Sequence, residues 1–195
     1  MKLARNAALL FIGTVTVTCG YRFTAGGAPL PEGIREVYAP VFVNRTGSNP
    51  IARLGETYRA ANEPGVEAIF TQAFREQLLR AGVAGGPNSE ARVEGEVLGV
   101  DSYPTVLSVG GTLASYRVSA RVRLRLVKNG RQLSSIDVAG SEDFVPSRQL
   151  FQSPDASTQI IEGDVLLTEA NRMSAIKRMA ETMMRDGYDR LATGW

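Results

Sequence analysis

Six basic residues, on one predicted strand and around the turn after it, are the side chains in this sequence best suited to bind a ligand. Residues 114–127 alternate apolar and polar with a period of two, which is typical of a strand with one buried face. The polar face and the turn carry Arg117, Arg121, Arg123, Arg125, Lys128 and Arg131. Guanidinium groups bind phosphates through paired hydrogen bonds. The row could therefore hold a phosphorylated glycolipid.

The same arginines could instead be paired within the sheet. Glu94 and Glu96 fall on the polar face of the preceding predicted strand, and Asp137 falls in the following one. Cross-strand pairs contribute only ~0.2–1 kcal/mol each, but they would use up the charge. We favour pairing, although both interpretations could hold at different ends of the strand. Lys128 and Arg131 have fewer obvious partners.

The residue types in this sequence give little support for a catalytic function. The chain has no histidine and one cysteine, which excludes His-based metal sites, Ser-His-Asp and Cys-His machinery, and an intrachain disulfide. Glu94 and Glu96 lie beside arginines, which favour ionised carboxylates and so disfavour a general acid. Ser174 and Lys177 spell S-x-x-K inside a predicted helix, without its partner motifs. We expect no catalytic residue, no metal and no cofactor.

The charge balance argues against nucleic acid as a partner. The chain carries 22 Lys and Arg against 20 Asp and Glu. Lys2 and Arg5 are the only charged residues among the first eighteen, so the rest of the chain carries 20 of each sign. Nucleic-acid-binding proteins normally keep a positive surplus.

The N-terminus predicts a signal peptide and a lipid anchor. A short basic start precedes the apolar run 7–17, which is too short to span a bilayer as a helix. Cys19, the only cysteine, lies two residues after this run and resembles the acylated cysteine of bacterial lipoproteins. We therefore expect residues 1–18 to be a signal peptide, Cys19 to be acylated, and 19–33 to be a tether. By the same resemblance, Gly20 favours the outer membrane, because an Asp there would indicate the inner membrane. The alternative is an ordinary signal peptide with a chance cysteine.

The rest of the chain predicts one α+β domain, 34–195. Period-two and period-3.6 patterns give the order β-α-β-β-β-α, with strands at 34–43, 90–102, 114–127 and 132–144 and helices at about 64–81 and 164–192. Two helices should pack on one face of a four-stranded mixed sheet. Pro40 suggests an edge strand or a bulge, Asn129-Gly130 a type I′ turn, and 145–163 a polar excursion. The last helix carries an apolar stripe at Leu166, Ala170, Met173, Ile176, Ala180, Met183 and Leu191.

The connection between the second and third predicted strands is apolar. Val106, Leu107 and Val109 have no obvious core face to join. An apolar hairpin tip can mark a contact with a partner. A buried hairpin end is the other interpretation.

Several segments, in this order, are similar to the LPS-assembly lipoprotein family (LptE-like): Cys19-Gly20-Tyr21, Leu30-Pro31-Glu32-Gly33-Ile34, Val41-Phe42-Val43-Asn44-Arg45-Thr46, Glu63-Pro64-Gly65-Val66-Glu67, Leu78-Leu79-Arg80-Ala81-Gly82 and Glu169-Ala170-Asn171-Arg172. The resemblance implies two helices on a four-stranded sheet. It also implies a non-enzymatic outer-membrane lipoprotein in a one-to-one complex with a β-barrel LPS translocon. There it would plug the barrel, aid its assembly and bind lipopolysaccharide. The runner-up is a lipid-anchored periplasmic adaptor for another envelope partner or anionic ligand.

Overall fold

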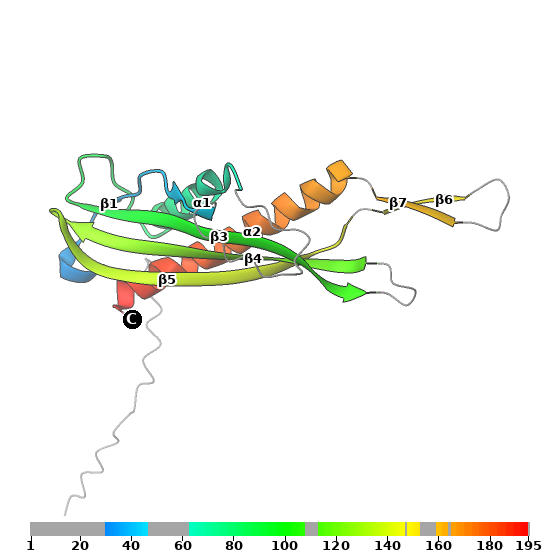
Figure 1. Cartoon of the computed structure of the whole chain (residues 1–195). Helices are drawn as coiled ribbons and strands as arrows, with labels where there is room; N and C mark the ends of the chain where they lie inside the picture. The colour runs from blue at the N-terminus through cyan, green and yellow to red at the C-terminus, as the bar shows by residue number, and fades with distance from the viewer. Residues whose placement is uncertain are drawn as a thin grey trace, which may run out of the picture.

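The computed structural model describes residues 30–46, 63–107, 113–146, 148–152, 159–163 and 165–194 of the 195-residue chain. A short 3-10 helix, η1 (Pro31–Gly33), opens the fold (Figure 1). The strands are β1 (Val37–Tyr38), β2 (Val43–Asn44), β3 (Ala91–Leu107), β4 (Leu113–Lys128), β5 (Arg131–Phe144), β6 (Arg148–Gln152) and β7 (Gln159–Gly163). The helices are α1 (Val66–Arg80) and α2 (Val165–Thr193).

The main sheet is mixed, and with the two helices it confirms the predicted α+β class. Its order is β1-β3-β4-β5, with β2 also paired to β3. β1 and β2 run parallel to β3, whereas β3, β4 and β5 form an antiparallel meander. The sheet therefore has five strands, one more than the sequence predicts.

The additional strand arises because the predicted strand 34–43 is broken near Pro40, which cannot donate a ladder hydrogen bond. Side chains of α1 bond to the backbone at the break. Arg75 donates to the carbonyl oxygen of Ala39 at 2.9 Å, and the amide of Phe42 donates to Thr71 Oγ1 at 2.9 Å. Two short edge strands, β1 and β2, result.

The segment after β5 also differs from the prediction. Instead of an irregular polar excursion, β6 and β7 pair as a separate two-stranded antiparallel sheet. Each strand has five residues. Strands of five residues are too short for their hydrophobic periodicity to predict them from the sequence.

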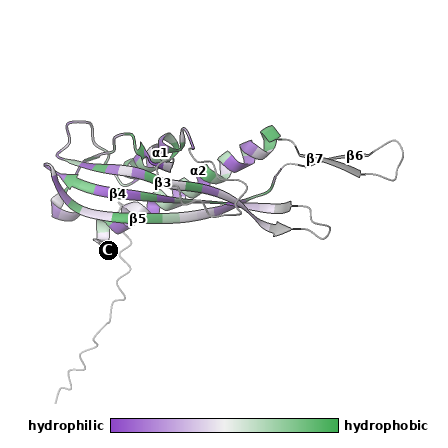
Figure 2. Ribbon diagram, in the orientation of Figure 1, coloured by the Kyte–Doolittle hydropathy of each residue, from purple (hydrophilic) through white to green (hydrophobic). Residues whose placement is uncertain are grey.

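Both helices pack against one face of the main sheet, and the core lies between the two layers (Figure 2). Two glycines permit close approach there. The Phe42 ring packs directly over Gly95, and Met183 of α2 packs over Gly140. The largest fully buried side chains, all below 2% exposure, are Tyr188, Phe70, Phe74, Leu78, Leu124, Leu126, Ile176, Met184, Leu191, Val37, Val66 and Val93.

A register shift in β3 changes which residues face the core. The pairing with β4 slips between Val97 and Gly99, as in a β-bulge. Val97 and Val100 are both buried as a result, although they are three residues apart. The shift leaves Gly99 in register with Arg121, on the face away from the helices.

The β4–β5 connection is as predicted. Asn129 and Gly130 have φ values of +49° and +80°, the left-handed backbone that a type I′ turn requires. The β4–β5 register shifts once between Leu126 and Val127, and beyond the shift Asp137 and Asp143 lie opposite Arg123 and Arg117.

The beginning of α2 differs from the predicted apolar stripe. Ile176, Ala180, Met183 and Leu191 are buried, but Leu166 is 83% exposed and Ala170 is also exposed. The stripe is wrong at these two positions because the first turns of α2 stand apart from the main sheet (Figure 1). Within the described segments, neither helix is long and apolar enough to cross a membrane.

Candidate functional site

The face of the sheet that the helices leave open carries acidic and basic side chains in register. Arg125 of β4 lies opposite Glu94 of β3, and Arg123 lies between Glu96 of β3 and Asp137 of β5. The pairing that the sequence suggested for Glu94, Glu96 and Asp137 is therefore the arrangement of the fold. On the β5 side it arises because the turn at Asn129-Gly130 returns the chain and a register shift between Leu126 and Val127 then moves Asp137 opposite Arg123.

Two arginines of β4 form forked salt bridges with β5. Arg117 donates from Nε and Nη2 to the two carboxylate oxygens of Asp143, at 2.6 and 2.9 Å. Arg123 does the same with Asp137, at 2.8 and 3.1 Å. These bonds raise the pKa of both guanidinium groups. The hydrogen bond from each arginine is also the largest cause that lowers the pKa of its partner carboxyl.

Arg125 pairs toward β3 instead. Its Nη2 donates to Glu96 Oε1 at 2.9 Å, and its Nε lies 3.9 Å from Glu94 Oε2. The side chain of Glu96 is only 16% exposed, so this pair is better shielded from solvent than the two bridges to β5. Three arginines of the predicted row are thus held by acids of neighbouring strands.

The basic residues around the β4–β5 turn bind the start of the domain. Lys128 Nζ donates to the carbonyl oxygen of Glu32 at 3.0 Å and lies 3.7 Å from Glu90. Arg131 forms an ion pair with the Glu32 carboxylate. The sequence did not suggest these partners because Glu32 lies about a hundred residues away. These contacts of Lys128 and Arg131 attach η1 to the β4–β5 turn.

Arg121 differs from the rest of the row. It is exposed and forms no salt bridge with any described residue. Its register neighbours are Gly99 and Ala139, which carry no acid. Its charge contributes to the lowered pKa of Asp137, whose carboxylate is already held by Arg123.

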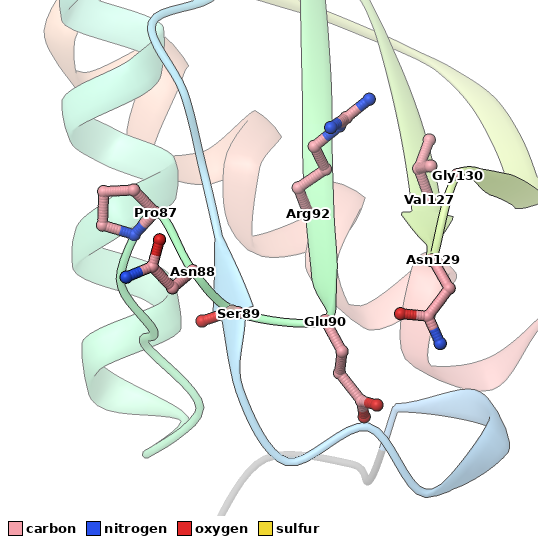
Figure 3. A pocket seen from close by; sticks show the side chains of 8 residues that line it. All are labelled: Pro87, Asn88, Ser89, Glu90, Arg92, Val127, Asn129 and Gly130. Atoms are coloured by element: carbon pink, nitrogen blue, oxygen red, sulfur yellow. The ribbon is translucent and has the colours of Figure 1, made fainter.

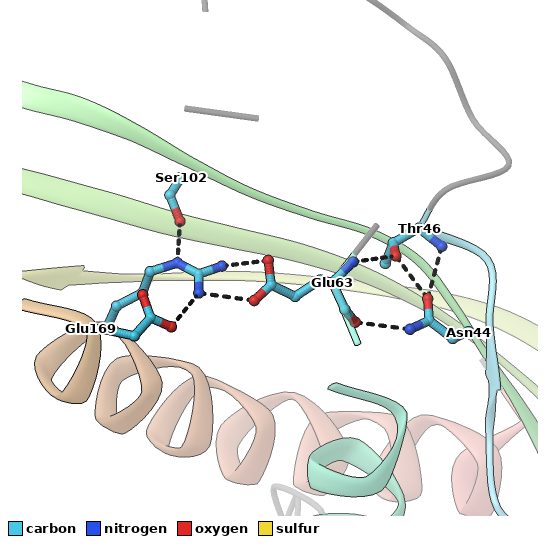
Figure 4. Close-up of polar contacts among 6 residues, drawn as sticks. Asn44, Thr46, Glu63, Ser102 and Glu169 are labelled. Carbon is cyan, nitrogen blue, oxygen red and sulfur yellow. Dashed lines mark hydrogen bonds and ion pairs between the residues drawn. The ribbon is translucent and has the colours of Figure 1, made fainter. Parts of the chain in front are cut away.

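A second polar cluster lies between the layers, centred on Arg172 of α2 (Figure 4). Its guanidinium group meets both carboxylate oxygens of Glu63, at 2.9 and 2.7 Å, and also bonds Glu169 at 2.9 Å and Ser102 Oγ at 3.1 Å. The Arg172 and Glu63 side chains are only 14% and 11% exposed. Burial acts to lower the pKa of Arg172, but the acids around it outweigh burial, and the pKa is raised. The sequence reasoning did not identify this cluster.

The network continues from Glu63 to the end of β2. The amide of Glu63 donates to Thr46 Oγ1 at 3.0 Å, and Asn44 Nδ2 donates to the carbonyl oxygen of Glu63 at 2.8 Å. Asn44 Nδ2 also donates to the Glu67 carboxylate of α1 at 2.9 Å. Residues of β2, β3, α1 and α2 are thereby joined in one network, in which Glu63 bonds Arg172 through its carboxylate and bonds Asn44 and Thr46 through its backbone.

A shallow hollow of about 280 Å³ lies at the other end of the sheet, between the loop before β3 and the β4–β5 turn (Figure 3). Its lining includes Ser89, Glu90, Arg92 and Asn129. Arg92 is paired with Glu94 at 2.8 Å, and Glu90 lies near Lys128. The hollow thus offers no unpaired charge on which a ligand site could be based.

The beginning of α2 presents apolar side chains to solvent. Val165 and Leu166 are 79% and 83% exposed, and Val145 is 61% exposed. Val145 lies beside the helix, because Asn171 of α2 donates to its carbonyl oxygen at 3.0 Å. We call Val145, Val165 and Leu166 the apolar end. The β3–β4 hairpin extends toward the same end of the molecule (Figure 1).

Comparison with known proteins identifies the protein family to which this chain belongs. A family model described as lipopolysaccharide-assembly, LptE, matches residues 34–191. The chain belongs to the LptE family. No curated protein sequence matches the chain.

Solved structures similar to this chain include the hypothetical protein CT253 from Chlamydia trachomatis, with 12% identity, a TM-score of 0.47, and coverage of 81% of this chain and 96% of that one. The rare lipoprotein B from Shewanella oneidensis has 11% identity, a TM-score of 0.45, and coverage of 82% and 92%. A minor lipoprotein from Acinetobacter baumannii has 8% identity, a TM-score of 0.45, and coverage of 83% and 93%.

Segments that resemble the LptE family meet in the structure. Asn44 and Thr46 from one segment, Glu63 from another and Arg172 from a third belong to the same hydrogen-bonded network. Glu32, from the first described segment, joins the β4–β5 turn. The segments that resemble the family therefore contain residues that connect separate parts of the fold.

The remaining predicted site residues are less fully described. Cys19 and Val109 lie outside the described residues. The backbones of Val106 and Leu107 form the last part of β3, in register with Ser115 and Leu113. Their role as a partner contact stays a prediction. Among the described residues, no group of three or more acids or cysteines is arranged to hold a metal ion.

Proposed function

We propose that this chain is an outer-membrane lipoprotein that plugs a β-barrel LPS translocon, helps to assemble it and aids insertion of LPS into the outer leaflet. The match of residues 34–191 to the lipopolysaccharide-assembly family carries this proposal. The role is one of binding and positioning, with no catalytic residue and no cofactor.

The proposed anchor is an acylated Cys19, exposed by removal of residues 1–18, with residues 19–33 leading into the domain. Several acyl chains on one residue give stable attachment, whereas a single chain gives marginal binding. The chain reaches the core at Leu30, and Glu32 is held by Lys128 and Arg131. The proposed anchor thus joins the domain at the turn end of the sheet, and the apolar end lies at the opposite end (Figure 1).

The open face of the sheet suits the lumen of a barrel. Wide barrels have polar interiors. The bridges of Arg117, Arg123 and Arg125 make this face polar, and they offset most of its charge. A surface of this kind can lie against a polar wall without leaving many unpaired charges.

A second proposed contact with the barrel lies at the opposite end from the anchor. Val106 and Leu107 end β3, and Val109 follows it in sequence. The apolar end, Val145, Val165 and Leu166, supplies exposed apolar surface at the same end of the molecule (Figure 1). Exposed apolar patches commonly mark protein contacts. We assign this region to the barrel subunit of a one-to-one complex.

Purification of the tagged protein from native outer membranes tests the proposal. The expected result is the LPS barrel protein in equal amount, with LPS also present. A Cys19→Ser variant should lose lipid labelling and fall in abundance in the outer-membrane fraction. Recovery of a different envelope protein, without the barrel, would favour the adaptor function and reject the translocon proposal.

A further inference from the structure

Arg121 marks a gap in the salt bridges that the described residues form on the open face. The neighbouring arginines Arg117, Arg123 and Arg125 are held by acids at 2.6 to 2.9 Å. Arg121 lies on the same face between Gly99 and Ala139, and it makes no salt bridge to a described residue. A guanidinium group in this position keeps its five donors available to a ligand.

The space beside Arg121 is open. A Cβ atom added to Gly99 would meet no other atom within 4 Å. Gly99 also lies at the register shift of β3, and glycines at such positions often mark close approach of a ligand or another chain. Gly95, four residues earlier, faces the core instead, where Phe42 covers it. Gly99 thus leaves open space next to Arg121 on the open face.

Further groups on the same face define the chemistry of the gap. Ser119 lies two residues before Arg121 and is in register with Ser141 of β5, so two hydroxyl groups lie next to the arginine. Asp101 of β3 is in register with Ser119 and takes part in another interaction. Arginine and hydroxyl donors suit a phosphate, whereas Asp101 opposes one.

We propose that the gap at Arg121 holds a phosphate group of the glycolipid that this protein handles. Gly99 and Ala139 leave space for the phosphate, Arg121 provides the charge, and Ser119 and Ser141 provide further donors. The proposal rests on the proposed function, since that function supplies the glycolipid. Of the six basic residues in the sequence prediction, it assigns phosphate binding to Arg121, which makes no salt bridge with a described residue.

Binding of phosphorylated lipid A in detergent micelles to the purified protein tests the assignment. Arg121→Gln should weaken binding about tenfold while the melting temperature stays unchanged. Gly99→Glu should have a similar effect, because its carboxylate would neutralise Arg121. Asp101→Asn should strengthen binding. Arg123→Gln is the matched control, from which we expect a lower melting temperature and binding within twofold of the wild type.

The outcomes separate this inference from the proposed function. Equal losses of binding in Arg121→Gln and Arg123→Gln, or no loss in Arg121→Gln, would overturn the assignment. Equal binding of dephosphorylated lipid A would also overturn it. Arg121-dependent binding of inorganic phosphate, without binding of lipid A, would assign the gap to a free anion and reject the lipid. We expect the barrel to co-purify with both the wild-type protein and Arg121→Gln. Absence of the barrel from the wild-type purification would reject the translocon proposal, whereas it would not bear on phosphate binding at Arg121.

Discussion

Arg172 of α2 holds both carboxylate oxygens of Glu63, at 2.9 and 2.7 Å, in a position where both side chains are almost fully shielded from water. Glu63 begins the segment that leads into α1 and is bonded to Thr46, which follows β2. One ion pair therefore connects the C-terminal helix to segments more than a hundred residues earlier. A shielded pair of this kind is costly to break, because the remaining charge stays buried.

Arg172→Ala should lower the free energy of unfolding by about 2–3 kcal/mol, because it leaves the Glu63 carboxylate partly buried without its partner. Urea denaturation followed by circular dichroism measures the loss. Arg178→Ala is the control, since its bridge to Glu142 is exposed and should contribute less than about 1 kcal/mol. Equal effects of the two substitutions would contradict the structural role of Arg172.

A double-mutant cycle refines this prediction. Glu63→Gln and Arg172→Ala together should cost less than the sum of the two single changes, because each removes the same bond. Strict additivity would mean that the two side chains do not interact in solution.

Gly95→Ala should destabilise the fold by about 1–3 kcal/mol, because the added methyl group would lie about 2.5 Å from the Phe42 ring, which is buried. Gly99→Ala, on the same strand, is the matched control, since its methyl group would meet nothing within 4 Å. Thermal melting of both variants decides the matter. A larger loss for Gly99→Ala would contradict the arrangement of β2 and β3.

The free energy of unfolding should fall in acid, because the carboxylates of the salt bridges on the open face become protonated there. The pKa values of Asp137 and Asp143 are lowered from 3.8, mainly by hydrogen bonds from Arg123 and Arg117. A lowered folded-state pKa adds stability that is fully present above the unfolded value and is lost as pH falls through the folded one. The loss therefore belongs below about pH 4.

Urea denaturation from pH 7 to pH 2 measures this dependence. Asp137→Asn should make stability less dependent on pH in the acid range. Asp189→Asn serves as the control, because Asp189 forms no salt bridge with any described residue. An unchanged acid profile in Asp137→Asn would show that the Arg123 bridge does not persist in solution.

Leu166→Asp should reduce recovery of the barrel subunit, because it places a charge in the proposed contact. Thermal stability should not change, because Leu166 is 83% exposed and is not part of the core. Quantitative mass spectrometry of the purified complex measures the recovery. Leu191→Asp, on the buried face of the same helix, should instead unfold the protein. Normal barrel recovery with Leu166→Asp would exclude the apolar end from the interface.

Much of the fold follows from local patterns in the sequence. The alternation of residues 114–127, the Asn129-Gly130 turn and the stripe from Ile176 to Leu191 predict β4, its hairpin and most of α2. Local periodicity sufficed because these features depend on residues close together in the chain. The turn alone would place Ile136 opposite Arg123. A register shift between Leu126 and Val127 brings Asp137 into that position, and the alternating pattern does not mark this shift.

Features that depend on distant residues could not be predicted in this way. The register shift at Gly99 places a glycine opposite Arg121, and nothing in the alternating pattern marks it. Glu32 reaches Lys128 and Arg131, and Glu63 reaches Arg172, only after the chain has folded. Leu166 fits the helical stripe by spacing but lies beyond the part of the sheet that α2 covers.

The most direct test of the central claim is the amount of LPS at the cell surface when the protein is depleted in the bacterium that makes it. The account predicts that newly made LPS fails to reach the outer leaflet and that the assembled barrel declines, and that both are restored by the wild-type chain. Normal surface LPS and normal barrel assembly after depletion would contradict a role in LPS assembly.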